Sequence, residues 1–234
     1  MSDFFTNLGQ RLYDDFLVEN RYMYLVKGLG NTIIITIGAL IIGVILGVLV
    51  ALVRVNHQND HRKLRVLNAI CVLYLTLFRG TPTIVQLMLF YFVFLVNIRN
   101  GITVAIIAFG LNSGAYMAEV IRSGIQSVDR GQMEAGRSLG LSQKQTLSKI
   151  ILPQAFKNVA PAVFNEFITL VKETSVAGYV GIADLTKGGD VLRSITWDPF
   201  PPLLAVALVY LIIVIFLTAI LRQIERRLAR SDLR

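Results

Sequence analysis

Residues 28–53 read GLGNTIIITIGALIIGVILGVLVALV, a run of 26 residues without a charged side chain. A helix needs ~20 apolar residues to cross the ~30 Å hydrocarbon core of a bilayer, so this run is long enough to span a membrane. Ala39, Gly43, Gly47 and Ala51 recur in it at every fourth position. Small residues at this interval let helix backbones approach closely in lipid, and the stripe therefore predicts a helix-packing face.

Four further segments have the length of a transmembrane helix. Residues 80–98, 100–118 and 199–221 carry no charge, whereas residues 158–179 contain Glu166, Lys172 and Glu173. The chain is 54% hydrophobic and only 16% charged, which is not the balance of a soluble domain. We therefore predict an all-α, polytopic integral membrane protein with five transmembrane helices in one domain.

The segments before and after this domain differ from it in composition. Residues 1–27 mix acids and bases and lack the apolar core of a cleavable signal peptide. Leu8, Leu12 and Phe16 recur there at helical spacing, which predicts an amphipathic interfacial helix before the first span. Residues 223–234 form a basic tail. Cys71 is the single cysteine, so an internal disulfide and a cysteine-based metal cluster are excluded, and we expect no metal site.

The net charge of +8 is distributed along the chain in a way that does not suggest nucleic-acid binding. Fifteen of the 23 basic residues fall in the loop after the first span, the loop after the third span and the C-terminal tail, whereas the alternate segments hold six. Basic residues collect on the cytoplasmic side of membrane proteins. We therefore expect the N-terminus outside the cell and the C-terminus in the cytoplasm.

The second span is interrupted by the sequence RGTPT, residues 79–83. Proline removes a backbone donor and glycine loosens the chain, so we expect a kink or a break here. Arg79, Thr83, Gln86 and Phe90 then share one helix face. Two interpretations stay open: a structural kink with an arginine that reaches the interface, or a discontinuous helix that lines a transport pathway.

Two spans carry polar stripes. Asn112, Tyr116, Glu119 and Ser123 share one face of the third span. In the fourth span, Glu166, Thr169 and Glu173 fall on one side with Lys172 beside them. A charge inside a bilayer costs at least ~2.5–3.5 kcal/mol, so these side chains are candidates for function. The structural alternative is an ion pair between Glu119 and Lys172 that locks two helices together.

Residues 129–153 are too polar to span a membrane and contain two helix-start signals. Asp129 followed by Gln132 predicts one helix, which Gly140 would end in a left-handed conformation. Ser142 followed by Gln145 predicts a second helix that ends near Leu152, before Pro153. Neither helix is long enough to be stable alone in water, so we expect the hairpin to dock on a partner. An ordinary interfacial loop would explain its length but not its caps.

The hairpin sequence EAGRSLGLSQKQTLSKIILP resembles the signature of ABC-importer permeases. Matches occur, with every interval correct, at Glu134, Ala135, Gly140, Ile150, Leu152 and Pro153. Gly136 departs from the pattern, because a second alanine is usual there. Glycine weakens a helix by ~1 kcal/mol relative to alanine, so we expect somewhat looser coupling at this position.

The resemblance extends over residues 28–228. GLGNTIIIT, FRGTPTIVQL, NSGAYMAEVIRSGIQSVDRGQ and VKETSV look like the branch that imports polar and charged amino acids, with Glu173 in place of a more usual aspartate. It implies a type I ABC-importer permease fold over residues 28–222 in a bacterial cell membrane. It also implies a partner ATPase dimer that binds ATP and magnesium and docks on the hairpin, an extracytoplasmic binding protein, and a second permease subunit. This chain would bind no cofactor. It contains no Gly-Lys pair, hence no phosphate-binding loop of the G-x-x-x-x-G-K-[ST] type.

The resemblance also implies a substrate path at Tyr116, Glu119, Lys172, Glu173 and Thr174, and the broken helix adds Arg79 and Gln86 as candidates. Two acids against one base favour a polar or cationic amino acid over an acidic one. Two alternatives stay open: an ion-coupled carrier or channel that uses Glu119 and Glu173 as cation sites, and the same architecture with another cargo. The external segment, residues 179–200, would gate the outer mouth or act as a plain connector, with Trp197 as an interfacial anchor.

Overall fold

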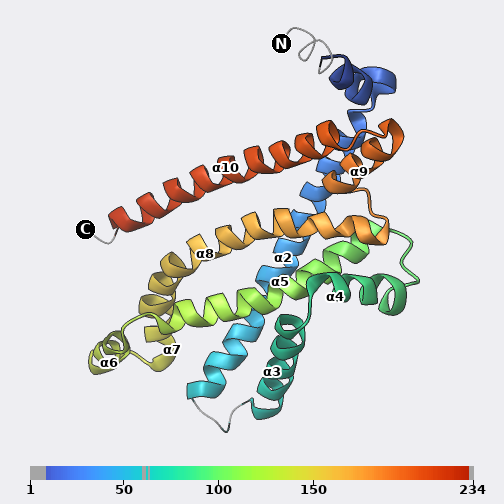
Figure 1. The fold of residues 1–234 in the computed structure, drawn as a ribbon. Coiled ribbons are helices and arrows are strands. Elements are labelled where there is room, and N and C mark those ends of the chain that lie inside the picture. Colours follow the sequence, from blue (N-terminus) through green and yellow to red (C-terminus); the bar gives the residue numbers. More distant parts are fainter. Residues whose placement is uncertain (1–8, 60–61, 63, 232–234) are drawn as a thin grey trace.

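The longest helix, α2 (Met23–Asn59), forms the axis of the fold in a computed structural model that describes residues 9–59, 62 and 64–231 (Figure 1). Helix α5 (Gly101–Gln126) packs along it more extensively than any other element. A Cβ on Gly43 would lie 2.9 Å from Ser113 Oγ, and one on Gly47 would lie 2.5 Å from Met117 Cβ. Ala39 and Ala51 are fully buried. The predicted packing face is therefore confirmed.

The predicted break in the second span is confirmed. Helix α3 (Arg65–Gly80) ends before the extended residues Thr81 and Pro82, and α4 (Thr83–Leu89) follows with a π-helical turn, η3 (Phe90–Phe94). The helix axis bends by 109° between the two halves. Pro82 restricts the residue before it to extended backbone, which ends α3 at this point.

The polar hairpin consists of α6 (Arg130–Ser138), α7 (Gln143–Thr146) and the π-helical turn η4 (Leu147–Ile151). Its predicted caps are confirmed. The Asp129 side chain accepts a hydrogen bond from Gly131 N, and Ser142 and Gln145 form a complete capping box. Gly140 has φ +83°, the left-handed conformation that ends α6.

The expected helix end before Pro153 is wrong. The chain continues without interruption from η4 into α8 (Leu152–Glu173), and Pro153 lies in the first turn of α8. The π-helical turn precedes the proline directly, so the donor that Pro153 lacks falls where the hydrogen-bond pattern already changes. The second arm of the hairpin is thus an extension of α8. A 3-10 segment, η5 (Thr174–Val180), follows α8.

The C-terminal part contains a short helix, α9 (Leu185–Thr196), and a long one, α10 (Phe200–Ser231), which packs on α8 and α9. Figure 1 shows α10 extending from α9 toward the C-terminus. Several large apolar side chains of α10 are exposed, namely Leu208, Leu211, Ile212, Ile215 and Phe216. Such a surface suits lipid or another membrane-spanning chain.

The N-terminal segment is helical where the structure describes it. Residues 9–12 are helical, followed by η1 (Tyr13–Leu17) and η2 (Val18–Asn20). Arg11 pairs with Asp198 at 2.6 Å, which holds this segment beside the start of α10. Leu12 and Leu17 are exposed apolar side chains, as an interfacial helix requires. The part of this prediction that concerns residues 1–8 lies outside the described residues.

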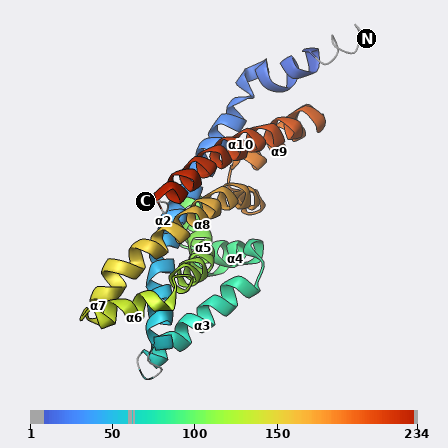
Figure 2. The ribbon, with the colours of Figure 1, turned by 90° about the vertical axis from the view of Figure 1, so that its left-hand side faces the viewer.

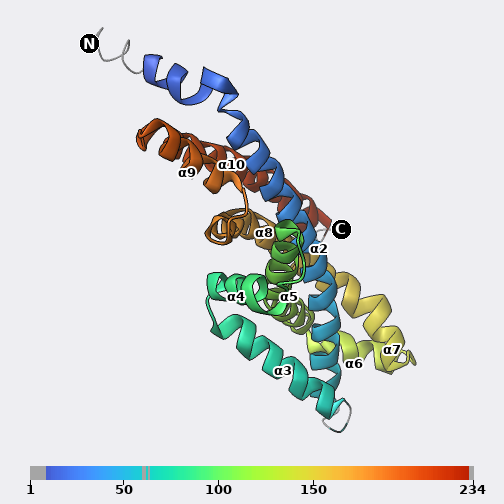
Figure 3. The ribbon, with the colours of Figure 1, turned by 90° about the vertical axis from the view of Figure 1, so that its right-hand side faces the viewer.

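The buried core lies where α2, α4, α5, α8 and η5 meet, around Ile35, Leu87, Phe109 and Leu170. Every element described in residues 9–59, 62 and 64–231 is helical. By length and hydropathy α2, α5 and α10 could each cross a membrane, and the bent α3–α4 pair would make a fourth. Figures 2 and 3 show the N-terminal segment and α9 at one end of the molecule, and α6, α7 and the start of α3 at the other.

Candidate functional site

The corner between α3 and α4 is held by Gln86. Its side-chain nitrogen donates to Phe78 O at 2.9 Å, to Thr81 O at 3.0 Å and to Thr81 Oγ1 at 2.8 Å. Its Oε1 accepts from Asn112 Nδ2 at 2.8 Å. Gln86 thereby occupies carbonyl groups that the broken helix leaves open and ties the corner to α5. These hydrogen bonds give Gln86 a structural role, since they stabilise the corner and its attachment to α5.

Beside this corner, residues of α3, α5 and α8 line an open cleft of about 640 Å³. It is lined by Arg79, Tyr116, Glu119, Val120, Ser123, Gly124, Ser127, Asn158 and Ala162. The cleft therefore brings together four residues that the sequence singled out, Arg79 from α3 and Tyr116, Glu119 and Ser123 from α5. Arg79 lies over the ring of Tyr116, with 5.5 Å between the guanidinium carbon and the ring centroid. A guanidinium on an aromatic face stays available for an anionic group on its open side.

Glu119 forms an ion pair with Arg122, three residues further along α5. Arg122 Nε donates to Glu119 Oε2 at 3.1 Å, and Arg122 Nη2 donates to Glu119 Oε1. Arg122 Nη1 also donates to Gln126 Oε1 at 2.5 Å, and Gln126 Nε2 donates to Gln58 Oε1 at 2.6 Å. The polar chain thus runs from the cleft to α2. Arg122 is a residue that the sequence reasoning missed, although the i, i+3 spacing to Glu119 could have indicated it.

Helix α8 ends with Lys172 and Glu173, and η5 begins with Thr174. The described residues that line the cleft include none of these three. Thr174 is fully buried, and its hydroxyl donates to Val171 O at 2.8 Å. Lys172 is exposed and Glu173 is half-buried. Nearer the middle of α8, Glu166 Oε1 accepts a hydrogen bond from Ser113 Oγ of α5 at 3.0 Å. Of the two acids, Glu119 therefore lines this cleft and Glu173 does not.

The hairpin exposes one set of the family-pattern residues and buries another. Glu134 and Ala135 are exposed on α6, and Leu139 beside the Gly140 turn is 81% exposed. Gly136 is buried against Thr146, Ile150 is half-buried, and Leu152 and Pro153 are exposed. At the base of the hairpin, Met133 and Leu147 pack against a buried cluster of Ile125, Ile151 and Ala155. A small polar face with one projecting leucine is suited to dock in a groove of a partner.

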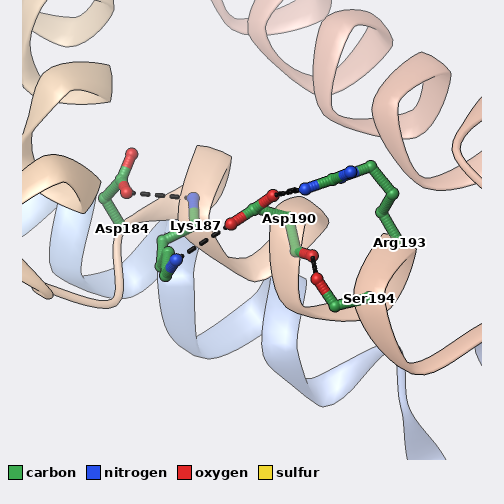
Figure 4. A network of polar contacts seen from close by, with 5 residues as sticks. All are labelled: Asp184, Lys187, Asp190, Arg193 and Ser194. Carbon is green, nitrogen blue, oxygen red and sulfur yellow. Dashed lines mark hydrogen bonds and ion pairs between the residues drawn. The ribbon is translucent and has the colours of Figure 1, made fainter.

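Within the segment of residues 179–200, Leu185–Thr196 form helix α9. Asp184 caps α9 by accepting from Thr186 N at 3.1 Å and Lys187 N at 3.0 Å. Asp190 accepts from Lys187 Nζ at 2.9 Å and Arg193 Nη2 at 2.6 Å (Figure 4). These hydrogen bonds, that from Lys187 first and those from Arg193 next, lower the pKa of Asp190. Trp197, 91% exposed, ends the helix with φ 56°.

A second cleft of about 570 Å³ lies against α9, between η5 and α10, and it includes Ser175, Tyr179, Lys187 and Arg193. Because each basic residue on α9 is already paired with Asp190, this network mainly fixes the helix and contributes a single excess positive charge to the cleft.

Comparison with known proteins gives consistent matches over nearly the whole chain. Residues 43–230 match the model of the family described as "binding-protein-dependent transport system inner membrane component". A putative glutamine transport system permease protein GlnP of Rickettsia bellii is 38% identical over 90% of this chain and 95% of its own. The arginine transport system permease protein ArtQ of Bacillus subtilis is 35% identical over 89% of this chain and 94% of its own.

A solved structure, described as an amino acid ABC transporter with histidines, contains a chain of the same fold. It superposes with a TM-score of 0.82 at 36% sequence identity, covering 91% of this chain and 98% of that chain. The bent α3–α4 pair, the hairpin and α8 all lie within the residues that the family model matches.

Proposed function

The chain belongs to the family of binding-protein-dependent transport system inner membrane components, and on that premise we propose that it forms half of the translocation pathway of an ATP-driven amino-acid importer. It is a multi-pass protein of the cell membrane. The observation that carries the proposal is that the cleft and the capped hairpin share α8, since Asn158 and Ala162 line the cleft on the helix that begins in the hairpin.

We propose five membrane spans: α2, the bent α3–α4 pair, α5, α10 and, as the most polar one, α8. Its Glu166, Lys172 and Glu173 make it too polar for a test based on hydropathy, but its 22 residues are long enough to cross and it packs on α2, α5 and α10. The N-terminus would be outside and the C-terminus in the cytoplasm. The arrangement at the two ends supports this, because the end of α2, the start of α3 and the basic hairpin lie at one end of the molecule and α9 lies at the other.

The hairpin would receive a separate ATPase dimer on its exposed face of Glu134, Ala135 and Leu139. Closure of the ATPases on ATP would displace two such hairpins and move the helix bundles between outward- and inward-facing states, a rigid-body switch. In this scheme ATP and magnesium bind to the partner chain, and this chain performs no catalysis. A second permease, identical or related, would supply the other half of the pathway, and an extracytoplasmic binding protein would deliver the cargo.

The cargo we propose is a polar or cationic amino acid, supported by the relatives named for glutamine and arginine. The cleft geometry changes the charge argument. Glu119 is already neutralised by Arg122, and among the described residues that line the cleft Arg79 is the charged one that forms no ion pair. Arg79 is therefore suited to the α-carboxylate that all amino acids share, and charge alone does not distinguish a cationic side chain from a neutral polar one.

Reconstitution tests the proposal. The chain, with its ATPase and second permease, is placed in proteoliposomes with the binding protein outside and ATP inside. We expect uptake of labelled glutamine, arginine or histidine only when both ATP and the binding protein are present. Uptake that a proton or sodium gradient drives without the ATPase would instead support the ion-coupled carrier. Cysteine labelling in a Cys71→Ser background tests the topology: Ser194→Cys should react from outside and Ser138→Cys from the cytoplasm.

A further inference from the structure

Gly136 lies at the point where the two arms of the hairpin touch. A Cβ built at Gly136 would lie 2.5 Å from Thr146 Cγ2, 2.9 Å from Thr146 Oγ1 and 3.3 Å from Ile150 Cδ1. Real Cβ atoms essentially never approach another heavy atom within 3.0 Å. The two arms are therefore closer together than alanine at position 136 would allow.

Thr146 is not free to move out of the way. Its side chain is fully buried, and its Oγ1 donates to Ser142 O at 3.1 Å. A β-branched side chain also has few alternative rotamers in a helix. An added methyl group at Gly136 would thus displace helix against helix, and would not merely rotate a flexible side chain.

The arm that Gly136 touches leads directly to the cleft. Thr146 ends α7, and the helical chain continues through η4 into α8, which lines the cleft with Asn158 and Ala162. Met133 of α6 packs on the same apolar cluster as Leu147 and Ile151 of the second arm. A displacement of α6 is therefore transmitted to α8 through close packing.

We propose that the Gly136–Thr146 contact is the joint that makes the hairpin a single rigid lever, with Gly136 as a positioning residue for coupling. The role in transport rests on the proposed docking of an ATPase, whereas the joint itself is a property of this chain. Helix propensity alone predicts the opposite effect, because alanine within a helix is ~1 kcal/mol more favourable than glycine. Close packing against Thr146 predicts that Gly136→Ala weakens coupling, whereas helix propensity predicts that it strengthens coupling. The sign of the effect therefore decides between them.

The test compares four variants with the wild type in the assembled transporter. Gly136→Ala introduces the clash, and Gly136→Ala with Thr146→Ala removes both short contacts by moving one methyl group across the interface. Gly136→Ala with Thr146→Val keeps the bulk, and Thr146→Ala alone is the control. The first measurement is the number of amino acids imported per ATP hydrolysed. The second needs no ATPase: nitroxide labels at Ser138 and Lys149, in a Cys71→Ser background, report the distance between the arms by electron resonance.

We expect Gly136→Ala to lower import per ATP several-fold and to shift or broaden the distance distribution. Thr146→Ala should restore both measurements in the double variant, and Thr146→Val should not. Equal import per ATP and equal label distances in Gly136→Ala and the wild type would overturn the proposal. So would a double variant in which Thr146→Ala restores neither measurement. If the wild type imports nothing with ATP while the spin-label pattern is as expected, the proposed function fails and the joint stands.

Discussion

The cleft and the hairpin share α8, but they are built from different kinds of residue. The cleft has long charged side chains from two helices, Arg79 on α3 and Glu119 on α5, and it leaves about 640 Å³ open. The hairpin has small residues and caps, with Gly136 pressed against Thr146 and Gly140 in a left-handed turn. The cleft can accommodate a small polar molecule, and the hairpin can move as a rigid unit. Each region should therefore fail in its own way when it is altered.

The largest effect is expected at the hairpin turn. Proline at position 140 cannot adopt the φ of +83° that Gly140 has, because its ring fixes φ near −65°. Gly140→Pro should therefore abolish both ATPase co-purification and uptake. Gly140→Asn is the matched control, since asparagine tolerates the left-handed region, and it should keep most of both activities. Full ATPase co-purification with the proline variant would show that the turn is not needed for docking.

A smaller effect is expected from Glu119→Gln in the cleft. It removes from the cleft the carboxylate that pairs with Arg122. A hydrogen bond to a charged group contributes ~1.5–3 kcal/mol, and 1.4 kcal/mol is a factor of ten. We expect uptake to fall about tenfold while the ATPase stays bound.

The check on the cleft is uptake of labelled arginine, histidine and glutamine at equal expression, with Thr103→Ala, an exposed position of α5 outside the cleft, as a control. Wild-type rates for all three amino acids in Glu119→Gln would exclude a role for this carboxylate in the substrate path.

A substitution at the corner between α3 and α4 should affect the stability of the protein more than its transport specificity. Gln86→Leu removes the donor to Phe78 O and Thr81 O and the acceptor for Asn112. Unpaired buried groups cost ~1–3 kcal/mol, so we expect the melting temperature in detergent to fall by about 5 °C. Val85→Leu on the exposed face of α4 should change it little. An unchanged melting temperature in Gln86→Leu would contradict the bracing role.

The smallest effect is expected on α9. Asp190→Asn weakens two exposed ion pairs, and such pairs contribute ~0–1 kcal/mol. The lowered pKa of Asp190 means that its pairs stabilise the fold above its unfolded pKa of about 4 and lose this contribution as the pH falls through its lower folded pKa. Thermal unfolding at neutral pH should therefore be nearly the same in wild type and Asp190→Asn. A large loss of stability would indicate that the network holds more than α9.

The sequence was informative where a structure depends on near neighbours. The caps at Asp129 and Ser142, the turn at Gly140 and the break at Pro82 are set by a few adjacent residues, and all were predicted. Pro153 misled because a proline that ends one helix and a proline in the first turn of the next leave the same local pattern.

Features that depend on tertiary contacts were beyond sequence reasoning. Gly136 looked like a weak helix position, and only its contact with Thr146, ten residues away, gives a reason for glycine there. Glu119 could be paired in principle with Lys172 or with Arg122, and the structure selects Arg122. The division of the candidate residues between the cleft and the end of α8 depends on how three helices cross, which no local pattern encodes.

The most direct test of the account uses one variant from each region in the same assay. ATPase co-purification and ATP-driven uptake are measured for wild type, Glu134→Lys on the exposed face of the hairpin, and Glu119→Gln in the cleft. The account predicts that Glu134→Lys loses the ATPase and therefore uptake, whereas Glu119→Gln keeps the ATPase and loses most of its uptake. Wild-type ATPase binding and uptake in Glu134→Lys would contradict the claim that the hairpin connects this chain to its source of energy.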